Sequence, residues 1–145
     1  MKITSSVFKH DGKIPSKYTC DGENISPPLQ FVDVPTESKI LALVMDDPDA
    51  PMGTFDHWVV WNLSPDLESI EEGEEPKGVQ GTNGFGNMGY GGPCPPSGEH
   101  RYFFKLYALK VKIDLPVSSR KKELENALEG NVIEQATLMG RYSRS

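Results

Sequence analysis

The sequence predicts a mostly β protein built as one domain. Its 145 residues are enough for one substantial core and too few for two comfortable ones, so the domain is expected to span residues 1–145. The chain holds 14 glycines and 12 prolines, and its apolar residues fall into several short runs. This composition favours short strands joined by many turns over a bundle of helices.

Five strands are expected, at residues 2–8, 29–34, 39–46, 55–63 and 101–111. The first alternates only weakly and is an edge candidate. The third and fourth contain runs so apolar that both faces of these strands should be buried. The last is rich in aromatic and branched side chains, which makes it the strongest strand candidate.

Two short helices are expected towards the C-terminus. The first should begin after Ser118 or Ser119, either of which can cap it, and end before Gly130. Residues 133–139 are expected to form the second, followed by an extended tail.

Charge and cysteine usage restrict the partners. The net charge of −6 leaves no basic stripe for nucleic acid and gives no attraction to anionic lipid surfaces. The N-terminus lacks the apolar core of a signal peptide and no stretch reaches membrane-spanning length, so we expect a cytoplasmic protein without stable membrane insertion. In a reducing compartment Cys20 and Cys94 would be free thiols, and a disulfide would need a proximity that their spacing does not establish.

Two loops differ in character. Residues 66–77 are strongly acidic and are expected to form a solvated loop. Residues 78–98 hold most of the glycines, with Phe85, Met88 and Tyr90 among them. These side chains are too apolar for a free linker, so we expect a long ordered loop whose backbone closely approaches something else.

An acidic turn connects the two central strands. Asp47 and Asp49 lie where the third strand ends, and His57 lies where the fourth begins. Pro48 and Pro51 should stiffen this turn. A stiff turn with carboxylates and an imidazole at the rim of a core is a candidate ligand site. A polar connection with a coincidental histidine is the alternative.

A second junction carries the other candidate residues. His100 ends the glycine-rich loop and opens the strongest strand, with Tyr102 just behind it. We expect the two junctions to converge, so that Asp47, Asp49, His57, His100 and Tyr102 line one cavity walled by the backbone of Gly91, Gly92 and Pro93. His10 lies in an early turn without such company and is assigned a structural or solvent role.

These motifs resemble a known family. The elements Asp47-Pro48-Asp49-Ala50-Pro51, His57-Trp58, Gly91-Gly92-Pro93 and Gly98-Glu99-His100-Arg101-Tyr102 look like those of the phosphatidylethanolamine-binding proteins, which include the Raf kinase inhibitor proteins and prokaryotic relatives. The segment from Cys20 to Leu29 and the short length are similar to the prokaryotic branch. The resemblance covers nearly the whole chain.

The resemblance implies a β-sandwich with short C-terminal helices and a small pocket for phosphate-like anions or phospholipid headgroups. By carry-over, the pocket would be lined by Asp47, Pro51, His57, Gly92, Pro93, His100 and Tyr102. One departure limits this transfer. Eukaryotic members have a longer segment with extra aromatic and histidine residues before the His57 position, where this chain has only residues 52–56. Headgroup selectivity and kinase binding therefore are not assigned from the resemblance alone.

A carboxylate in an anion pocket needs a role. We expect Asp47 to accept a hydrogen bond from His57 and so favour its protonated form. The outer imidazole nitrogen, the Tyr102 hydroxyl and backbone N–H groups near Gly92 would then donate to a phosphate oxygen. Strand alternation turns Arg101 away from Tyr102, so it is expected to pair with an acidic loop residue.

Other functions stay open at this point. Asp47, His57 and His100 could form a metal site or an acid–base pair for hydrolysis, although their context matches no zinc spacing and no G-x-S-x-G elbow is present. The resemblance also includes inhibitors of kinases and proteases, so a protein partner of either kind is a further alternative. We expect no cofactor and no catalytic residue, and a homodimer would be unsurprising.

Overall fold

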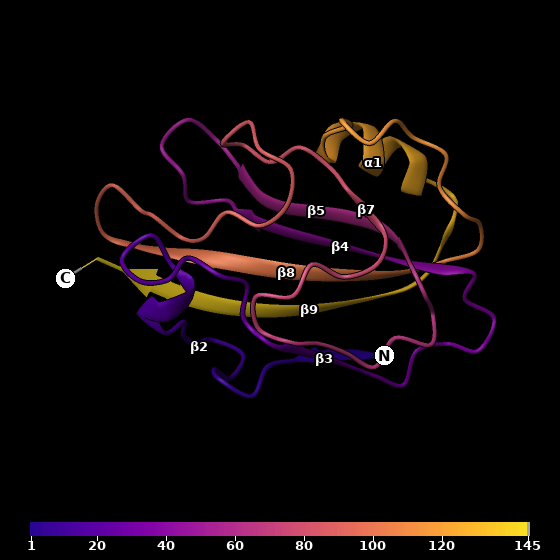
Figure 1. Cartoon of the computed structure of the whole chain (residues 1–145), viewed down its shortest axis with the longest axis horizontal. Coiled ribbons are helices and arrows are strands. Elements are labelled where there is room, and N and C mark those ends of the chain that lie inside the picture. Colours follow the sequence, from indigo (N-terminus) through magenta and orange to yellow (C-terminus); the bar gives the residue numbers. More distant parts are fainter. Residues whose placement is uncertain (145) are drawn as a thin grey trace.

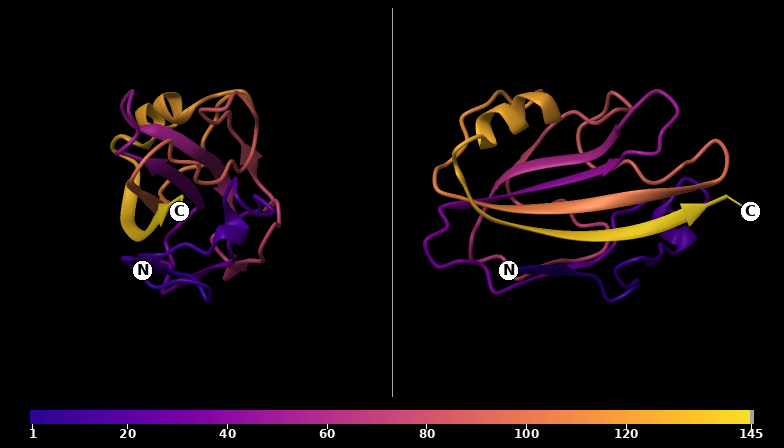
Figure 2. Two further views of the ribbon diagram at one scale, coloured as in Figure 1. Left: turned by 90° about the vertical axis from the view of Figure 1, so that its left-hand side faces the viewer. Right: turned by 180° about the vertical axis from the view of Figure 1, so that it is seen from behind.

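The computed structural model describes residues 1–144 and places two β-sheets face to face (Figures 1 and 2). The smaller sheet has the strand order β1-β3-β6, and the larger has the order β2-β9-β8-β4-β5-β7. The strands are β1 (Lys2–Thr4), β2 (Gly12–Lys13), β3 (Leu29–Val32), β4 (Ile40–Asp47), β5 (Phe55–Leu63), β6 (Ser69–Ile70), β7 (Val79–Gln80), β8 (Glu99–Leu109) and β9 (Val132–Ser143). A 3₁₀ turn η1 (Ser16–Tyr18) and one helix, α1 (Lys121–Leu128), complete the described elements. The chain is therefore mostly β, as its composition predicts, and forms the single-domain sandwich that the resemblance implies.

All five predicted strands are present, but the first is shorter than residues 2–8 because β1 ends at Thr4, and β3 ends two residues before its predicted end. β5 has the predicted bounds, and β4 and β8 lie within one or two residues of theirs. β6 and β7 have two residues each and were not predicted, because so short a strand leaves no readable pattern.

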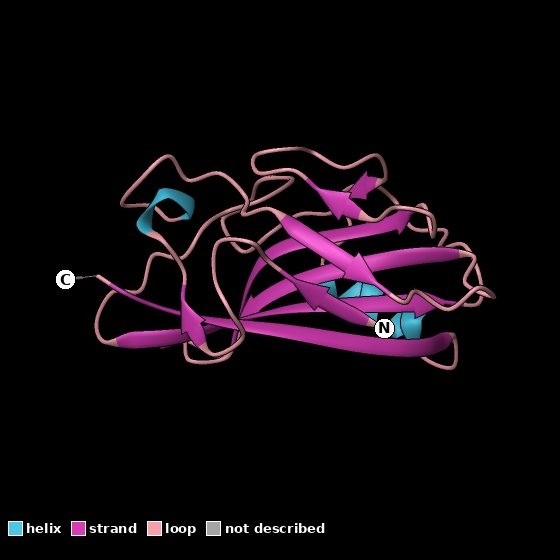
Figure 3. Cartoon of the chain, turned by 90° about the horizontal axis from the view of Figure 1, so that it is seen from below, coloured by secondary structure: helices cyan, strands magenta, loops and turns pink. Residues whose placement is uncertain are grey.

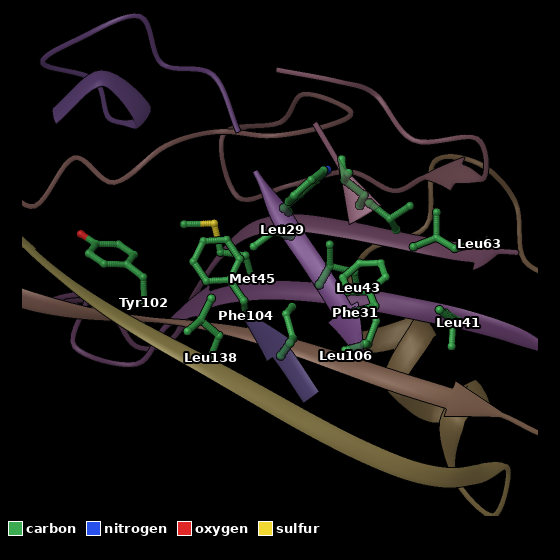
Figure 4. Close-up of a cluster of buried hydrophobic side chains, with 14 of the residues drawn as sticks. Leu29, Phe31, Leu41, Leu43, Met45, Leu63, Tyr102, Phe104, Leu106 and Leu138 are labelled. Atoms are coloured by element: carbon green, nitrogen blue, oxygen red, sulfur yellow. The ribbon is translucent and has the colours of Figure 1, made fainter. Parts of the chain in front are cut away.

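The main core lies between the two sheets. Side chains at alternate positions of β8 point inwards, and Tyr102, Phe104 and Leu106 are fully buried there. Figure 3 shows the short strands of the smaller sheet crossing the long strands of the larger one, and Leu29 and Phe31 of β3 cap the core from that side (Figure 4). β8, the strongest predicted strand, thus contributes large buried side chains to the core from the larger sheet.

The outer face of the larger sheet is also covered. Leu124 and Leu128 of α1 pack on Ala42, Val44 and Trp61 in a second apolar cluster. Because one face of β4 meets the sandwich core and the other meets this cluster, all eight of its residues are buried. This explains the unbroken apolar run that predicted burial on both faces.

The second predicted helix is wrong. Residues 133–139 lie in β9, which pairs antiparallel with β8 along nearly its whole length. Leu138 sits opposite Phe104 and enters the core, so the need to cover the open edge of β8 outweighs the local helical spacing. The first helix begins one residue later than predicted, with Arg120 as its N-cap, and Gly130 follows its C-cap with φ of +78°.

The expectation of free thiols is also wrong. Cys20 and Cys94 form a disulfide with their Cα atoms 5.4 Å apart. They lie 74 positions apart in the sequence, but the loop after η1 and the glycine-rich loop meet at one end of the molecule. The two cysteines are therefore close in space although they are far apart in the sequence.

The disulfide is expected to contribute to stability. Closing a loop of this length restricts the unfolded chain, so replacing both cysteines by serine should lower the free energy of unfolding by about 2–4 kcal/mol. Urea unfolding of the Cys20→Ser/Cys94→Ser variant and of the untreated protein measures this difference. Two titratable thiols in the untreated, natively folded protein would contradict the pairing.

Candidate functional site

The two predicted junctions meet at one end of the larger sheet, the end away from α1 in Figure 1. β4 runs antiparallel between β5 and β8, so its C-terminal end lies beside the N-terminal ends of both neighbours. Sheet pairing alone therefore brings the acidic turn after β4 next to His57 and to His100.

Two side-chain pairs bind the acidic turn to the start of β8. Asp47 Oδ2 lies 2.7 Å from His100 Nδ1, and Asp47 Oδ1 accepts a hydrogen bond of 2.8 Å from the Asp49 N–H. Asp49 in turn accepts two hydrogen bonds from the Arg101 guanidinium, at 2.8 and 2.9 Å, and one from the Arg101 N–H. All four carboxylate oxygens of Asp47 and Asp49 thus accept from a defined donor.

The Arg101 pairing agrees with the predicted one. The guanidinium holds the pKa of the Asp49 carboxyl down at about 2, so this carboxylate is charged throughout the physiological range. Arg101 is half exposed, which limits the pair to a few tenths of a kcal/mol up to about 1 kcal/mol of stability. The pair fixes the geometry of the turn more than it stabilises the fold.

His57 is held from the other side of the cavity. Its Nδ1 lies 2.7 Å from the Gly91 carbonyl oxygen, which can only accept, so Nδ1 carries the proton and Nε2 does not. The Gly91 N–H donates in return to the His57 carbonyl, at 2.9 Å. Burial lowers the pKa of the imidazole below its ordinary value of 6.5, against the opposing effects of the Gly91 hydrogen bond and of Asp47. The His57 ring is therefore neutral near pH 7.

Between the two imidazoles lies a cavity of about 190 Å³. Its lining residues are Asp47, Ala50, Pro51, Phe55, His57, Phe85, Cys94, Pro95, Pro96, His100 and Tyr102. The polar groups come from β4, β5 and β8, and the apolar remainder comes from Phe55 of β5 and from the loops. The Tyr102 hydroxyl is fully buried and has no hydrogen-bond partner within residues 1–144. In Figure 4 it points away from the labelled core side chains.

Five of the eight predicted site residues line this cavity: Asp47, Pro51, His57, His100 and Tyr102. The other three lie beside it and do not line it. Asp49 is bound to Arg101, and the Gly92 N–H donates to Asn24 Oδ1 at 2.9 Å. The Pro93 carbonyl accepts from the Cys20 N–H. The Gly92 N–H is therefore already used, and an anion contact at other backbone N–H groups near Gly92 stays a prediction.

The expected partner of Asp47 was also wrong. The carboxylate accepts a hydrogen bond from His100 Nδ1, whereas His57 Nδ1 donates to the Gly91 carbonyl. Asp47 lies opposite Phe55 in the β4–β5 pair, and its Oδ2 is directed at His100 on the other neighbouring strand, β8. Sequence proximity suggested the nearer histidine, and the fold selects the one 53 residues away.

The glycine-rich loop is ordered, as expected. Asn83 is almost fully buried and organises it: its side chain accepts from the N–H groups of Phe85 and Asn87 and donates to the Gly89 carbonyl. A Cβ on Gly91 would lie 2.5 Å from the Phe85 ring, so only glycine lets this ring close the cavity. The sequence reasoning missed the role of Asn83, and an asparagine within a glycine-rich loop was the only signal of it.

Asp46 does not belong to the cavity. It points to the opposite face of β4, where Lys105 and Lys121 lie 3.0 and 3.2 Å from its Oδ2. Within the described part of the chain, no group of three or more His, Cys, Asp or Glu side chains is arranged to hold a metal ion. No helix among residues 1–144 is long and apolar enough to cross a membrane.

The β-sandwich and its buried imidazole–carboxylate pocket define a small ligand-binding protein. The chain belongs to the phosphatidylethanolamine-binding protein family, whose model matches residues 4–143.

Relatives extend over the whole chain. A UPF0098 protein of Methanothermobacter thermautotrophicus is 51% identical over 150 residues, which cover 99% of both chains. The crystal structure of a phosphatidylethanolamine-binding protein homologue from Chlamydia trachomatis is similar with a TM-score of 0.96 at 44% identity, covering 99% of this chain and 97% of that one. The structure of E. coli YbcL, described as a member of the mammalian family, gives a TM-score of 0.92 at 32% identity and covers 99% and 98%. These names state no enzymatic activity.

The state of His57 can be measured directly. Nitrogen-15 NMR should show the Nδ1–H form at pH 8 and a titration midpoint below 6.5. Because the unfolded ring keeps its ordinary pKa, the unfolded state takes up the proton first, and this group lowers stability as the pH falls below about 6.5. A midpoint above 6.5, or the Nε2–H form at pH 8, would refute the assignment.

Proposed function

We propose that the cavity between His57 and His100 binds a phosphate-type anion, and that binding is coupled to proton uptake. The ligand class comprises inorganic phosphate, phosphomonoesters and phospholipid headgroups, which share the same tetrahedral, multiply charged acceptor. One observation carries this proposal. The imidazoles of His57 and His100, whose Nδ1–H groups already donate hydrogen bonds within the protein, share one small cavity with the Tyr102 hydroxyl, which has no partner within residues 1–144.

Hydrogen-bond inventory explains the proton coupling. Since Nδ1 of each ring donates to the protein, Nε2 of a neutral ring offers only a lone pair to the cavity. A fully deprotonated anion would face two lone pairs and the charge of Asp47. Anion binding becomes favourable when one of the imidazole rings takes up a proton, or when the ligand itself still carries one. Asp47 can then pair with a positive charge on His100, to which it is already hydrogen-bonded.

The apolar part of the lining strengthens such an interaction. Pro51, Phe55, Phe85, Pro95 and Pro96 line the cavity together with the polar groups. A charge-assisted hydrogen bond in such a poorly solvated place is stronger than one in water. Because the whole chain carries a net charge of −6, attraction of an anion has to come from these local donors.

The other functions considered from the sequence differ in their support. A metal enzyme built on Asp47, His57 and His100 receives less support because, within residues 1–144, no group of three or more His, Cys, Asp or Glu side chains is arranged to hold a metal ion. A hydrolase stays a prediction, which a phosphatase and esterase screen can test. A kinase or protease partner and a homodimer stay predictions, which a panel of these enzymes and size-exclusion chromatography can test.

Phosphate affinity should rise as the pH falls. Calorimetric titration with inorganic phosphate between about pH 8 and pH 5.5 should show steadily tighter binding and net proton uptake, because a lowered His57 pKa has to rise when an anion binds. His57→Ala and His100→Ala should each weaken binding about tenfold or more, the effect of losing a charged hydrogen bond. His10→Ala is the matched control, since His10 is exposed and bonds to the Met139 N–H.

Two comparisons separate the ligand sources. O-phosphoethanolamine binding much more tightly than phosphate would favour a lipid headgroup, and equal affinity would favour a free phosphate group. Ethanolamine alone should not bind. Affinity that is unchanged or increases towards pH 8, or that survives both histidine substitutions, would contradict the proposal.

The Tyr102 hydroxyl should affect binding and stability in opposite directions. Tyr102→Phe removes a buried polar group without a protein partner, so the free energy of unfolding without ligand should rise by about 1 kcal/mol. Phosphate affinity should fall about fivefold, as for one hydrogen bond. Urea unfolding and calorimetry measure the two effects. A hydroxyl with a purely structural role would give a less stable variant with unchanged affinity.

A further inference from the structure

The Cys20–Cys94 disulfide forms part of the wall of the proposed anion cavity. Cys94 lines that cavity, and both cysteines line a neighbouring cavity of about 240 Å³. Phe85 also lines both, so Phe85 and Cys94 are common to the two cavities. Both cysteine residues are partly exposed to solvent.

The disulfide lies within the contact that positions the partner of His57. Next to it, the Cys20 N–H donates to the Pro93 carbonyl, and the Gly92 N–H donates to the Asn24 side chain. The Tyr90 hydroxyl donates to the Tyr18 carbonyl at 2.7 Å. Residues 90–94 are therefore fixed on residues 18–24 by three hydrogen bonds and one covalent bond.

Gly91 lies in the middle of this fixed segment. Its carbonyl is the acceptor for His57 Nδ1–H, so its position sets the tautomer and the direction of the ring. Residues 18–24 are anchored in turn, because Tyr142 and Arg144 at the end of the chain both bind Asp21. A continuous series of contacts thus runs from the disulfide to the imidazole.

We propose that Cys20 and Cys94 are positioning residues of the anion pocket, so that anion affinity depends on their redox state. The inference rests on the anion-binding function proposed above and adds its regulation. The oxidised form holds Gly91 in place and binds the anion more tightly. In the reduced form residues 90–94 are held by hydrogen bonds alone, and His57 loses its fixed orientation for part of the time.

A dithiol can perform the reduction. One of its thiolates attacks a sulfur of the Cys20–Cys94 bond and forms a mixed disulfide, while the other cysteine leaves as a thiolate and takes up a proton. The second thiolate of the reagent then displaces the first cysteine, which is protonated in turn. The reagent becomes a cyclic disulfide, and two electrons and two protons reside on Cys20 and Cys94.

The test compares phosphate affinity in the two redox states. Calorimetry at about pH 6 with inorganic phosphate is performed on the untreated protein, on the same protein in excess dithiothreitol, and on Cys20→Ser/Cys94→Ser. We expect reduction to weaken binding about fivefold, and the variant to bind as weakly with or without reductant. Nitrogen-15 NMR should show His57 in the Nδ1–H form in the oxidised protein and in a mixture of tautomers in the reduced one, an effect that a role in stability alone would not produce.

A second variant keeps the test valid if the reduced protein unfolds. Asn24→Ala removes the acceptor of the Gly92 N–H while the disulfide stays intact, and it should also weaken phosphate binding and mix the His57 tautomers. If phosphate binds to all folded forms of the protein with the same affinity, the inference is overturned and the proposed function stands. Absence of phosphate binding to the oxidised protein would overturn both.

Discussion

The joining of the acidic turn to the start of β8 is the constraint on which the site depends. Asp47 binds His100 and Asp49 binds Arg101, so two neighbouring carboxylates of one turn are attached to two neighbouring residues of another strand. Strand alternation sends the first pair inwards to the cavity and the second outwards to solvent. Without this double attachment the turn would be an ordinary polar connection, the alternative that the sequence could not exclude.

This arrangement resolves the presence of carboxylates in a pocket proposed for anions. Asp49 is neutralised by Arg101 outside the cavity, and Asp47 orients His100. The buried histidine with the lowered pKa, His57, is paired with a carbonyl instead. With both rings neutral the empty pocket carries the charge of Asp47, and proton uptake by an imidazole offsets that charge, which suits a ligand that brings negative charge.

Much of the fold was predictable because its signals are local. The apolar run of β4 and the aromatic pattern of β8 identify strands without knowledge of their neighbours. The prediction of a helix at residues 133–139 was wrong because it used only local spacing, which is helical. Pairing with the edge of β8, a non-local interaction, favours a strand there. The prediction of free thiols was wrong for a similar reason. It rested on the reducing compartment expected for the protein, whereas the disulfide depends on the spatial proximity of Cys20 and Cys94.

The residues that line the site were more predictable from the sequence than the hydrogen bonds between them. The motifs placed five of eight residues on one cavity, because loop-to-strand junctions of paired strands must converge. The partner of each histidine depends on strand register, and the use of Gly92 depends on a side chain 68 positions away, Asn24. Such pairings are set by tertiary packing, and no spacing in the sequence encodes them.

A crystal structure of the oxidised protein grown with inorganic phosphate at about pH 5.5 tests the central claim most directly. The account predicts tetrahedral density between the Nε2 atoms of His57 and His100 and the Tyr102 hydroxyl, with both Nδ1 contacts unchanged. Density elsewhere with this cavity left empty, or imidazoles rotated away from Gly91 and Asp47, would contradict it.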